Sequence, residues 1–134
     1  MASALQHRLA LKMRINKIDG VGVTGPVILF DLLYKHKFPV KLVQGYCTVN
    51  GDSCWHVWVQ NGVEKFDIGY TLACMDEPEF AKCQFVLSEE APEAYDKDNL
   101  VITSWELYQK DPKEFWKKMP KKIQDFRAKI LREV

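Results

Sequence analysis

Two Asn-Gly dipeptides constrain the fold of this chain more than any other feature of its sequence. Asn50-Gly51 and Asn61-Gly62 each separate two largely apolar runs. Asn-Gly favours a type I′ turn, because both central residues of that turn need a positive φ angle. The two turns therefore predict a three-stranded antiparallel meander over residues 40–49, 52–60 and 63–70. The apolar run just before it, residues 27–34, predicts a buried helix.

The second turn predicts that a histidine and an aspartate face each other. With Asn61 and Gly62 as the two turn residues, antiparallel counting places His56 opposite Asp67. Directly opposed side chains have Cβ atoms about 4.5–5.5 Å apart, a gap that an imidazole and a carboxylate can bridge. An aspartate in that position orients the histidine, as the third member of a nucleophile–base–orienter triad does. The alternative is a purely structural His–Asp pair on a solvated face of the sheet.

The first turn predicts the neighbours of this pair on the other side. It pairs Gly45 with His56 and Cys47 with Cys54. Because side chains alternate along a strand, residues 54, 56, 58 and 60 share one face of the central strand. Residues 55, 57 and 59 share the other face, which is the more apolar and is predicted to pack on a core.

The whole chain has the composition of one globular domain. Its 134 residues are 47% apolar and 28% charged, and the formal net charge is +1. No apolar run is long enough to span a bilayer, and the N-terminal residues lack the apolar core of a signal peptide. We therefore expect a single soluble, cytoplasmic domain over residues 1–134, with its core at residues 20–90 and a helical segment at 104–134.

Helices are predicted on both sides of the meander. Residues 4–18 are predicted as a first helix. Pro26 follows a glycine-rich loop and suits the first position of the buried helix, where its missing N–H is not needed. Ser104 and Asp111 are predicted as helix caps, and residues 121–134 as an amphipathic helix.

The charges of the second half are divided between two segments. Residues 76–98 hold eight acids and two lysines, and we predict a surface loop there with one strand at residues 84–87. Residues 110–134 hold nine basic and four acidic residues. Because these basic residues alternate with acids, we expect a helical appendage rather than a contact with nucleic acid or with an anionic membrane.

The four cysteines form no CxxC motif, so we predict free thiols, no metal site and no cofactor. Cys47 and Cys54 face each other in the predicted register, which permits a cross-strand disulfide under oxidation. A zinc site is the alternative. It would combine these two thiols and His56 with Cys74 or Cys83, although the spacing matches no common zinc motif.

Three blocks of the sequence resemble the transglutaminase-like family. Residues 30–46 are similar to its apolar helix followed by the motif G-I-P-A-x-x-V-x-G-Y. The sequence H-V-W-V at residues 56–59 resembles the H-A-W-V strand of that family, and Phe66-Asp67 resembles its following aspartate. The blocks come in the order and spacing of the family, and the resemblance covers about residues 20–70, half of the chain.

The resemblance implies a papain-like α+β core, in which a buried central helix packs on an antiparallel sheet. It also implies acyl transfer or hydrolysis at an amide or ester, started by a cysteine thiolate at the N-terminus of that helix. Carried over by position, His56 and Asp67 are the catalytic pair, and Trp58, Gly45 and Tyr46 belong to the substrate site. The expected substrate is a protein or peptide.

The nucleophile of the family is missing from its position. That position falls at about Gly22, and residues 19–25 contain no cysteine. Four explanations stay open: a pseudoenzyme that binds a protein or peptide, Thr24 as a nucleophile, Cys54 as a nucleophile, or an engineered substitution at residue 22. Thr24 also suits plain helix capping, and strand rise alone places the Cβ of Cys54 about 6.5–7 Å from that of His56.

Overall fold

The computed structural model describes residues 1–19, 22–98 and 102–134. Within these ranges the chain combines α-helices with a four-stranded antiparallel sheet, which confirms the predicted mixture of α and β structure. Gly20 and Val21 of the predicted glycine-rich loop lie outside these ranges. The elements are α1 (Ala2–Ile15), α2 (Thr24–Lys35), β1 (Lys41–Val49), β2 (Asp52–Asn61), β3 (Glu64–Phe66), α3 (Ile68–Asp76), the 3₁₀ helix η1 (Pro78–Lys82), β4 (Phe85–Ser88), α4 (Thr103–Lys110), α5 (Pro112–Lys118) and α6 (Lys121–Glu133).

The first hairpin of the sheet has the predicted register. The strand order is β3-β2-β1-β4, and Gly45 on β1 lies opposite His56 on β2. Asn50 has a φ of 49° and Gly51 a φ of 89°, so both central residues of this turn are left-handed, as a type I′ turn requires. The Asn-Gly prediction is therefore confirmed for this hairpin.

The second hairpin differs from the prediction by one turn position. Asn61 belongs to β2 and pairs with Glu64. The turn residues are therefore Gly62 and Val63, and Gly62 has a φ of 61°. A type II′ turn accepts this arrangement, because it needs a positive φ only at its first central residue. The predicted pairing of His56 with Asp67 as strand partners is wrong, and every pair is shifted by two residues.

The predicted third strand is also too long. β3 ends at Phe66, and the next residue caps a helix where the sequence predicts the end of a strand and a loop. The Asp67 side chain accepts a hydrogen bond from the backbone N–H of Tyr70, which fixes the first turn of α3. Ile68 and Leu72 lie one helical turn apart, and both are buried on the inner face of α3.

A lysine side chain links the two edge strands of the sheet. The Lys65 ammonium group on β3 donates a hydrogen bond of 3.2 Å to the carbonyl oxygen of Leu87 on β4. β4 itself confirms the strand predicted at residues 84–87, displaced by one residue.

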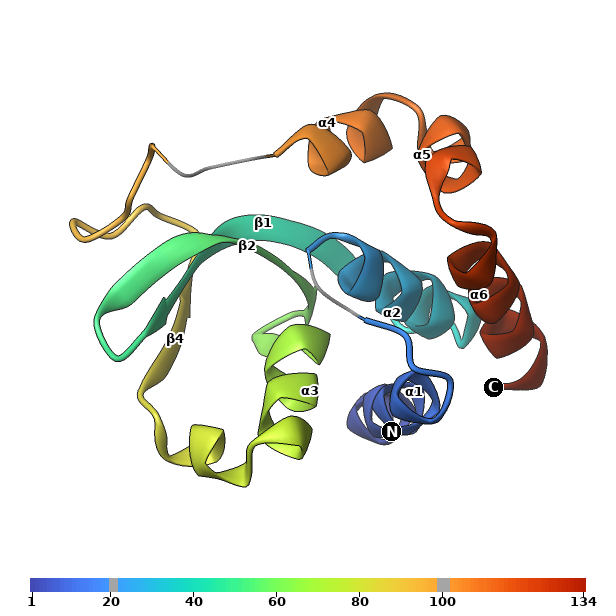
Figure 1. The fold of residues 1–134 in the computed structure, drawn as a ribbon, viewed down its shortest axis with the longest axis horizontal. Helices are drawn as coiled ribbons and strands as arrows, with labels where there is room; N and C mark the ends of the chain where they lie inside the picture. Colours follow the sequence, from blue (N-terminus) through green and yellow to red (C-terminus); the bar gives the residue numbers. More distant parts are fainter. Residues whose placement is uncertain (20–21, 99–101) are drawn as a thin grey trace.

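Helix α2 is the buried centre of the molecule, as predicted. It lies against β1 and β2, between α1 and α6 (Figure 1). The helix begins at Thr24, so Pro26 is its third residue rather than its first. Five of its side chains are fully buried: Val27, Ile28, Leu29, Leu32 and Leu33.

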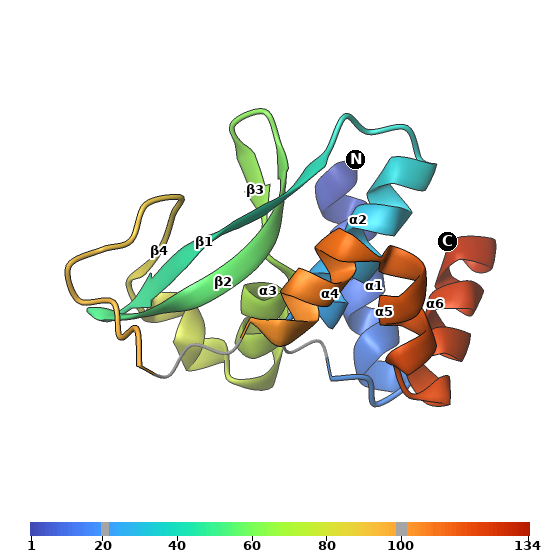
Figure 2. The same ribbon diagram turned by 90° about the horizontal axis from the view of Figure 1, so that it is seen from above.

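The C-terminal helices follow one another along the side of α1 and α2 (Figure 2). Trp105 of α4 and Phe115 of α5 are buried in an apolar cluster. Asp111 caps α5 as predicted, because its carboxylate accepts the backbone N–H of Glu114. Ser104 lies inside α4 and provides no cap, so that prediction is wrong.

Helix α6 confirms the predicted amphipathic helix. Phe126 and Ile130 on its inner face are buried in the main core. Arg127 forms a salt bridge of 2.8 Å with Asp31, which ties α6 to α2. Among the described residues, we find no helix with both the length and the apolar character that crossing a membrane requires.

Candidate functional site

The side chains of His56 and Asp67 are in direct contact, as the sequence predicted. The Nε2 atom of His56 lies 2.5 Å from the Oδ2 atom of Asp67. The Asp67 side chain is only 5% exposed, whereas that of His56 is 24% exposed. The aspartate is thus shielded from water, and the imidazole keeps one side accessible.

Helix α3, rather than the strand ladder, holds the aspartate. Asp67 Oδ1 accepts the N–H of Tyr70 at 3.1 Å, which leaves Oδ2 for the imidazole. The Asp67 carbonyl accepts hydrogen bonds from the N–H and the hydroxyl of Thr71. A carboxylate fixed through both oxygens and its own backbone can hold the histidine ring in one orientation.

The contact also sets the tautomer of His56. A carboxylate is an acceptor, so Nε2 carries a proton and the neutral ring has its lone pair on Nδ1. Within the described ranges, Nδ1 has no hydrogen-bond partner. This nitrogen can therefore accept a hydrogen bond from a ligand, or donate one when the ring is charged.

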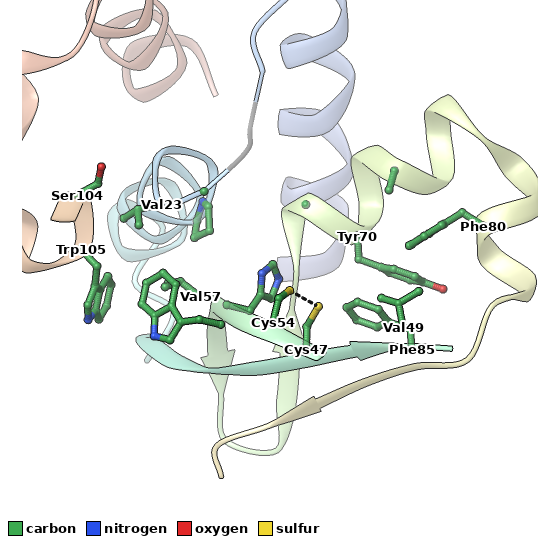
Figure 3. A pocket seen from close by; sticks show the side chains of 16 residues that line it. Val23, Cys47, Val49, Cys54, Val57, Tyr70, Phe80, Phe85, Ser104 and Trp105 are labelled. Atoms are coloured by element: carbon green, nitrogen blue, oxygen red, sulfur yellow. Dashed lines mark hydrogen bonds between the residues drawn. The ribbon is translucent and has the colours of Figure 1, made fainter. Parts of the chain in front are cut away.

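His56 lines an open groove with a volume of about 470 Å³. Its walls come from the N-terminal end of α2, from β1, β2 and β4, and from α3, η1 and α4. Tyr70, Phe80 and Phe85 gather at one end of the groove (Figure 3), where the rings of Tyr70 and Phe85 stack at 4.2 Å between centroids. Trp55 and Trp105 lie toward the other end and meet edge to face.

Gly22, the position predicted for the nucleophile, lines the same groove as His56. Its φ is 75°, and a Cβ atom built there would meet no atom of the described residues within 4 Å, its two chain neighbours left aside. The structure thus brings together Gly22, His56 and Cys54, which are three of the residues singled out in the sequence.

Thr24 is not placed to act on a ligand in the groove. It is the first residue of α2, and its hydroxyl donates to the sulfur of Met119 at 3.6 Å. It is neither the helix cap, which is Val23 without a side-chain bond, nor a residue of the groove wall. In the described part of the chain, no hydroxyl or thiol is hydrogen-bonded to His56.

Cys54 lies in the groove and is exposed, whereas its strand partner Cys47 is buried. Their sulfur atoms are 3.6 Å apart. Burial raises the pKa of the Cys47 thiol to about 12, and the neighbouring Cys54 adds to this shift. Cys47 therefore stays protonated at neutral pH. The zinc alternative finds no support, because the described residues contain no group of three potential ligands close enough to hold a metal ion.

The residues predicted to bind substrate have other neighbours. Trp58 is fully buried, so its ring offers no surface to a ligand, and the solvated face of the alternative interpretation does not hold at this residue. Gly45 lies beneath that ring, and a Cβ there would be 2.4 Å from Trp58 Cη2. Tyr46 packs on Tyr95 at 4.5 Å between ring centroids and lies outside the groove wall.

The sequence does not predict the aromatic walls of the groove. Its pattern predicts Tyr70 at the end of a strand and the segment with Phe80 in an acidic loop. One signal was present: Asp67 stands before Ile68 and Leu72, which is the pattern of an N-cap followed by an apolar helix face. That pattern predicts α3, although not the approach of η1 to the sheet.

A scan against protein-family models and searches of curated proteins and of solved structures gave no match to this chain. The resemblance to the transglutaminase-like family therefore rests on the sequence blocks alone. The contact of His56 with Asp67 is an observation, and the catalytic roles that the resemblance implies remain predictions.

Proposed function

We propose that this domain binds a peptide segment in the groove without covalent chemistry, with His56 as the polar anchor. One observation carries the proposal. His56 is fixed by Asp67 in a largely apolar groove, and within the described residues it has no thiol or hydroxyl bound to it. An oriented imidazole with no nucleophile hydrogen-bonded to it suits recognition better than acyl transfer.

The walls of the groove indicate what such a ligand contributes. An apolar side chain that packs against Tyr70 and Phe85 would gain about 1.5–3 kcal/mol from burial. A hydrogen bond to Nδ1 of His56 adds about 0.5–1.5 kcal/mol. The apolar walls would therefore supply most of the affinity, and His56 would set the direction of the bound chain.

Selection from a peptide library displayed on phage tests this proposal. Selected peptides are expected to bind the wild type, to bind Phe85→Ala about 10–100-fold more weakly, and to bind His56→Gln about tenfold more weakly. His7→Gln is the matched control, since His7 is an exposed histidine on α1. Equal affinity for wild type, Phe85→Ala and His56→Gln would contradict the proposal.

Acyl transfer or hydrolysis is the second candidate, and the position of Cys54 favours it. This exposed thiol lies in the groove, two residues from His56 on the same strand. Acyl transfer or hydrolysis is also the chemistry that the family resemblance implies, although here the nucleophile would be residue 54 instead of residue 22. An active thiol would give a burst of nitrophenol from p-nitrophenyl acetate and an acetyl group on Cys54. His56→Gln would then slow the burst at least 100-fold. A wild type without a burst supports the binding function.

A further inference from the structure

Cys47 and Cys54 are placed as a pair by the backbone. They are direct partners in the register of β1 and β2. Directly opposed residues of antiparallel strands have Cα atoms about 4.5–5.5 Å apart, which lies inside the range of about 4.4–6.8 Å for disulfides. Their sulfur atoms are 3.6 Å apart, on the floor of the groove (Figure 3). Side-chain rotation can therefore close the remaining distance with little movement of the backbone.

The two thiols differ in access to solvent. Cys54 is exposed on the groove side, whereas Cys47 is 6% exposed. A reagent from solution therefore meets Cys54 first. Cys47 reacts only with what its partner already carries, because the strand holds it within reach of that one sulfur.

From this arrangement we infer that Cys47 and Cys54 form a site of thiol–disulfide exchange that reacts with small disulfides such as oxidised glutathione. The Cys54 thiolate attacks one sulfur of the small disulfide, whose S–S bond breaks, and one small thiolate leaves. Cys47 then loses its proton and attacks the Cys54 sulfur. The second small thiolate leaves and takes up a proton. Two protein thiols are oxidised to a cross-strand disulfide, and one small disulfide is reduced to two thiols.

The burial of Cys47 determines the rate of the second step, in which Cys47 attacks the mixed disulfide on Cys54. Only the thiolate attacks a disulfide, and burial raises the pKa of the Cys47 thiol. The rate of closure should therefore rise about tenfold for each unit by which the pH is raised, as long as Cys47 is mostly protonated. The site does not depend on the peptide-binding function, since the exchange needs no ligand in the groove.

Peptide mapping of the full chain after incubation with oxidised glutathione tests this inference. Trypsin cleaves after lysine, so both cysteines fall in the peptide of residues 42–65, while Cys74 and Cys83 fall in two other peptides. We expect this peptide to lose two hydrogens and to resist alkylation. Full alkylation of the peptide after incubation at pH 9, or a disulfide from either cysteine to Cys74 or Cys83, would overturn the inference.

Two variants separate the steps. Cys47→Ser should stop at a mixed disulfide of glutathione on Cys54, and Cys54→Ser should leave Cys47 unmodified. Cys83→Ser is the matched control and should close as the wild type does. If Cys47→Ser does not fold by circular dichroism, Cys47→Ala replaces it. Loss of closure in Cys83→Ser, or a mixed disulfide on Cys47 in Cys54→Ser, would contradict the assignment.

Discussion

The two hairpins of the sheet contain the same dipeptide and use it differently. In the first, Asn50 and Gly51 are both left-handed and form the turn. In the second, Asn61 ends strand β2, and the turn passes to Gly62 and Val63. Asn-Gly thus predicts that the chain turns, but its neighbours decide which two residues occupy the turn.

Contacts outside each hairpin explain the difference. In the first hairpin, Asn50 accepts a hydrogen bond from the N–H of Gln84 and donates its own N–H to the Gln84 carbonyl, each at 3.0 Å. These bonds hold Asn50 at the turn. In the second, β3 is only three residues long, and α3 begins directly after Asp67. The helix, whose first residue Ile68 is fully buried, fixes where the strand must end.

The largest effect is expected from a substitution in the first hairpin, Gly45→Ala. The new Cβ would lie 2.4 Å from Trp58 Cη2 and 2.5 Å from the carbonyl oxygen of Ser88. Overpacking costs about 1–3 kcal/mol, and contact with backbone places this variant at the upper end. Urea denaturation measures the loss. Gly69→Ala, a matched change in α3, should alter the free energy of unfolding by less than about 1 kcal/mol. If Gly45→Ala leaves the free energy of unfolding unchanged, the strands of the first hairpin can move apart more easily than their register suggests.

Substitutions of Asp67 test how the end of β3 is joined to the start of α3. Asp67→Ala removes both the cap of α3 and the partner of His56, and should destabilise the fold by about 2 kcal/mol. Asp67→Asn keeps an acceptor for the Tyr70 N–H and should cost about 1 kcal/mol. Hydrogen exchange of the α3 amides separates the two effects, because only Asp67→Ala should expose the first turn. Equal exchange in both variants would mean that Asp67 does not cap the helix.

The smallest effects compare the two turn asparagines directly. Asn50→Ala places alanine in a left-handed conformation and removes the side-chain bond to Gln84, and the two losses together should cost about 2 kcal/mol. Asn61→Ala lies in an extended strand and should stay within about 0.5 kcal/mol of wild type. Asn50→Gly keeps the left-handed turn and isolates the bond to Gln84, about 1 kcal/mol. Chemical denaturation ranks the three variants. If Asn50→Ala and Asn61→Ala lower the free energy of unfolding equally, Asn61 occupies a turn position, as the sequence predicts for the second hairpin.

The contact of His56 with Asp67 was predicted correctly from a register that is wrong. The error is a shift of two residues, and side chains on a strand repeat with a period of two. In either register Asp67 therefore belongs to the face that carries His56 and Trp58. A shift of one residue would have moved the aspartate to the opposite face and removed the contact. The face of a side chain is thus more predictable than its partner.

The sequence by itself determined the buried helix α2, the first hairpin and the amphipathic α6, because each follows from local spacing of apolar or turn residues. Only the tertiary structure decided the end of β3, the burial of Trp58 and the walls of the groove. Those features join segments as distant as Gly22 and Trp105. Periodicity is a property of neighbouring residues, whereas a cavity depends on how distant segments pack.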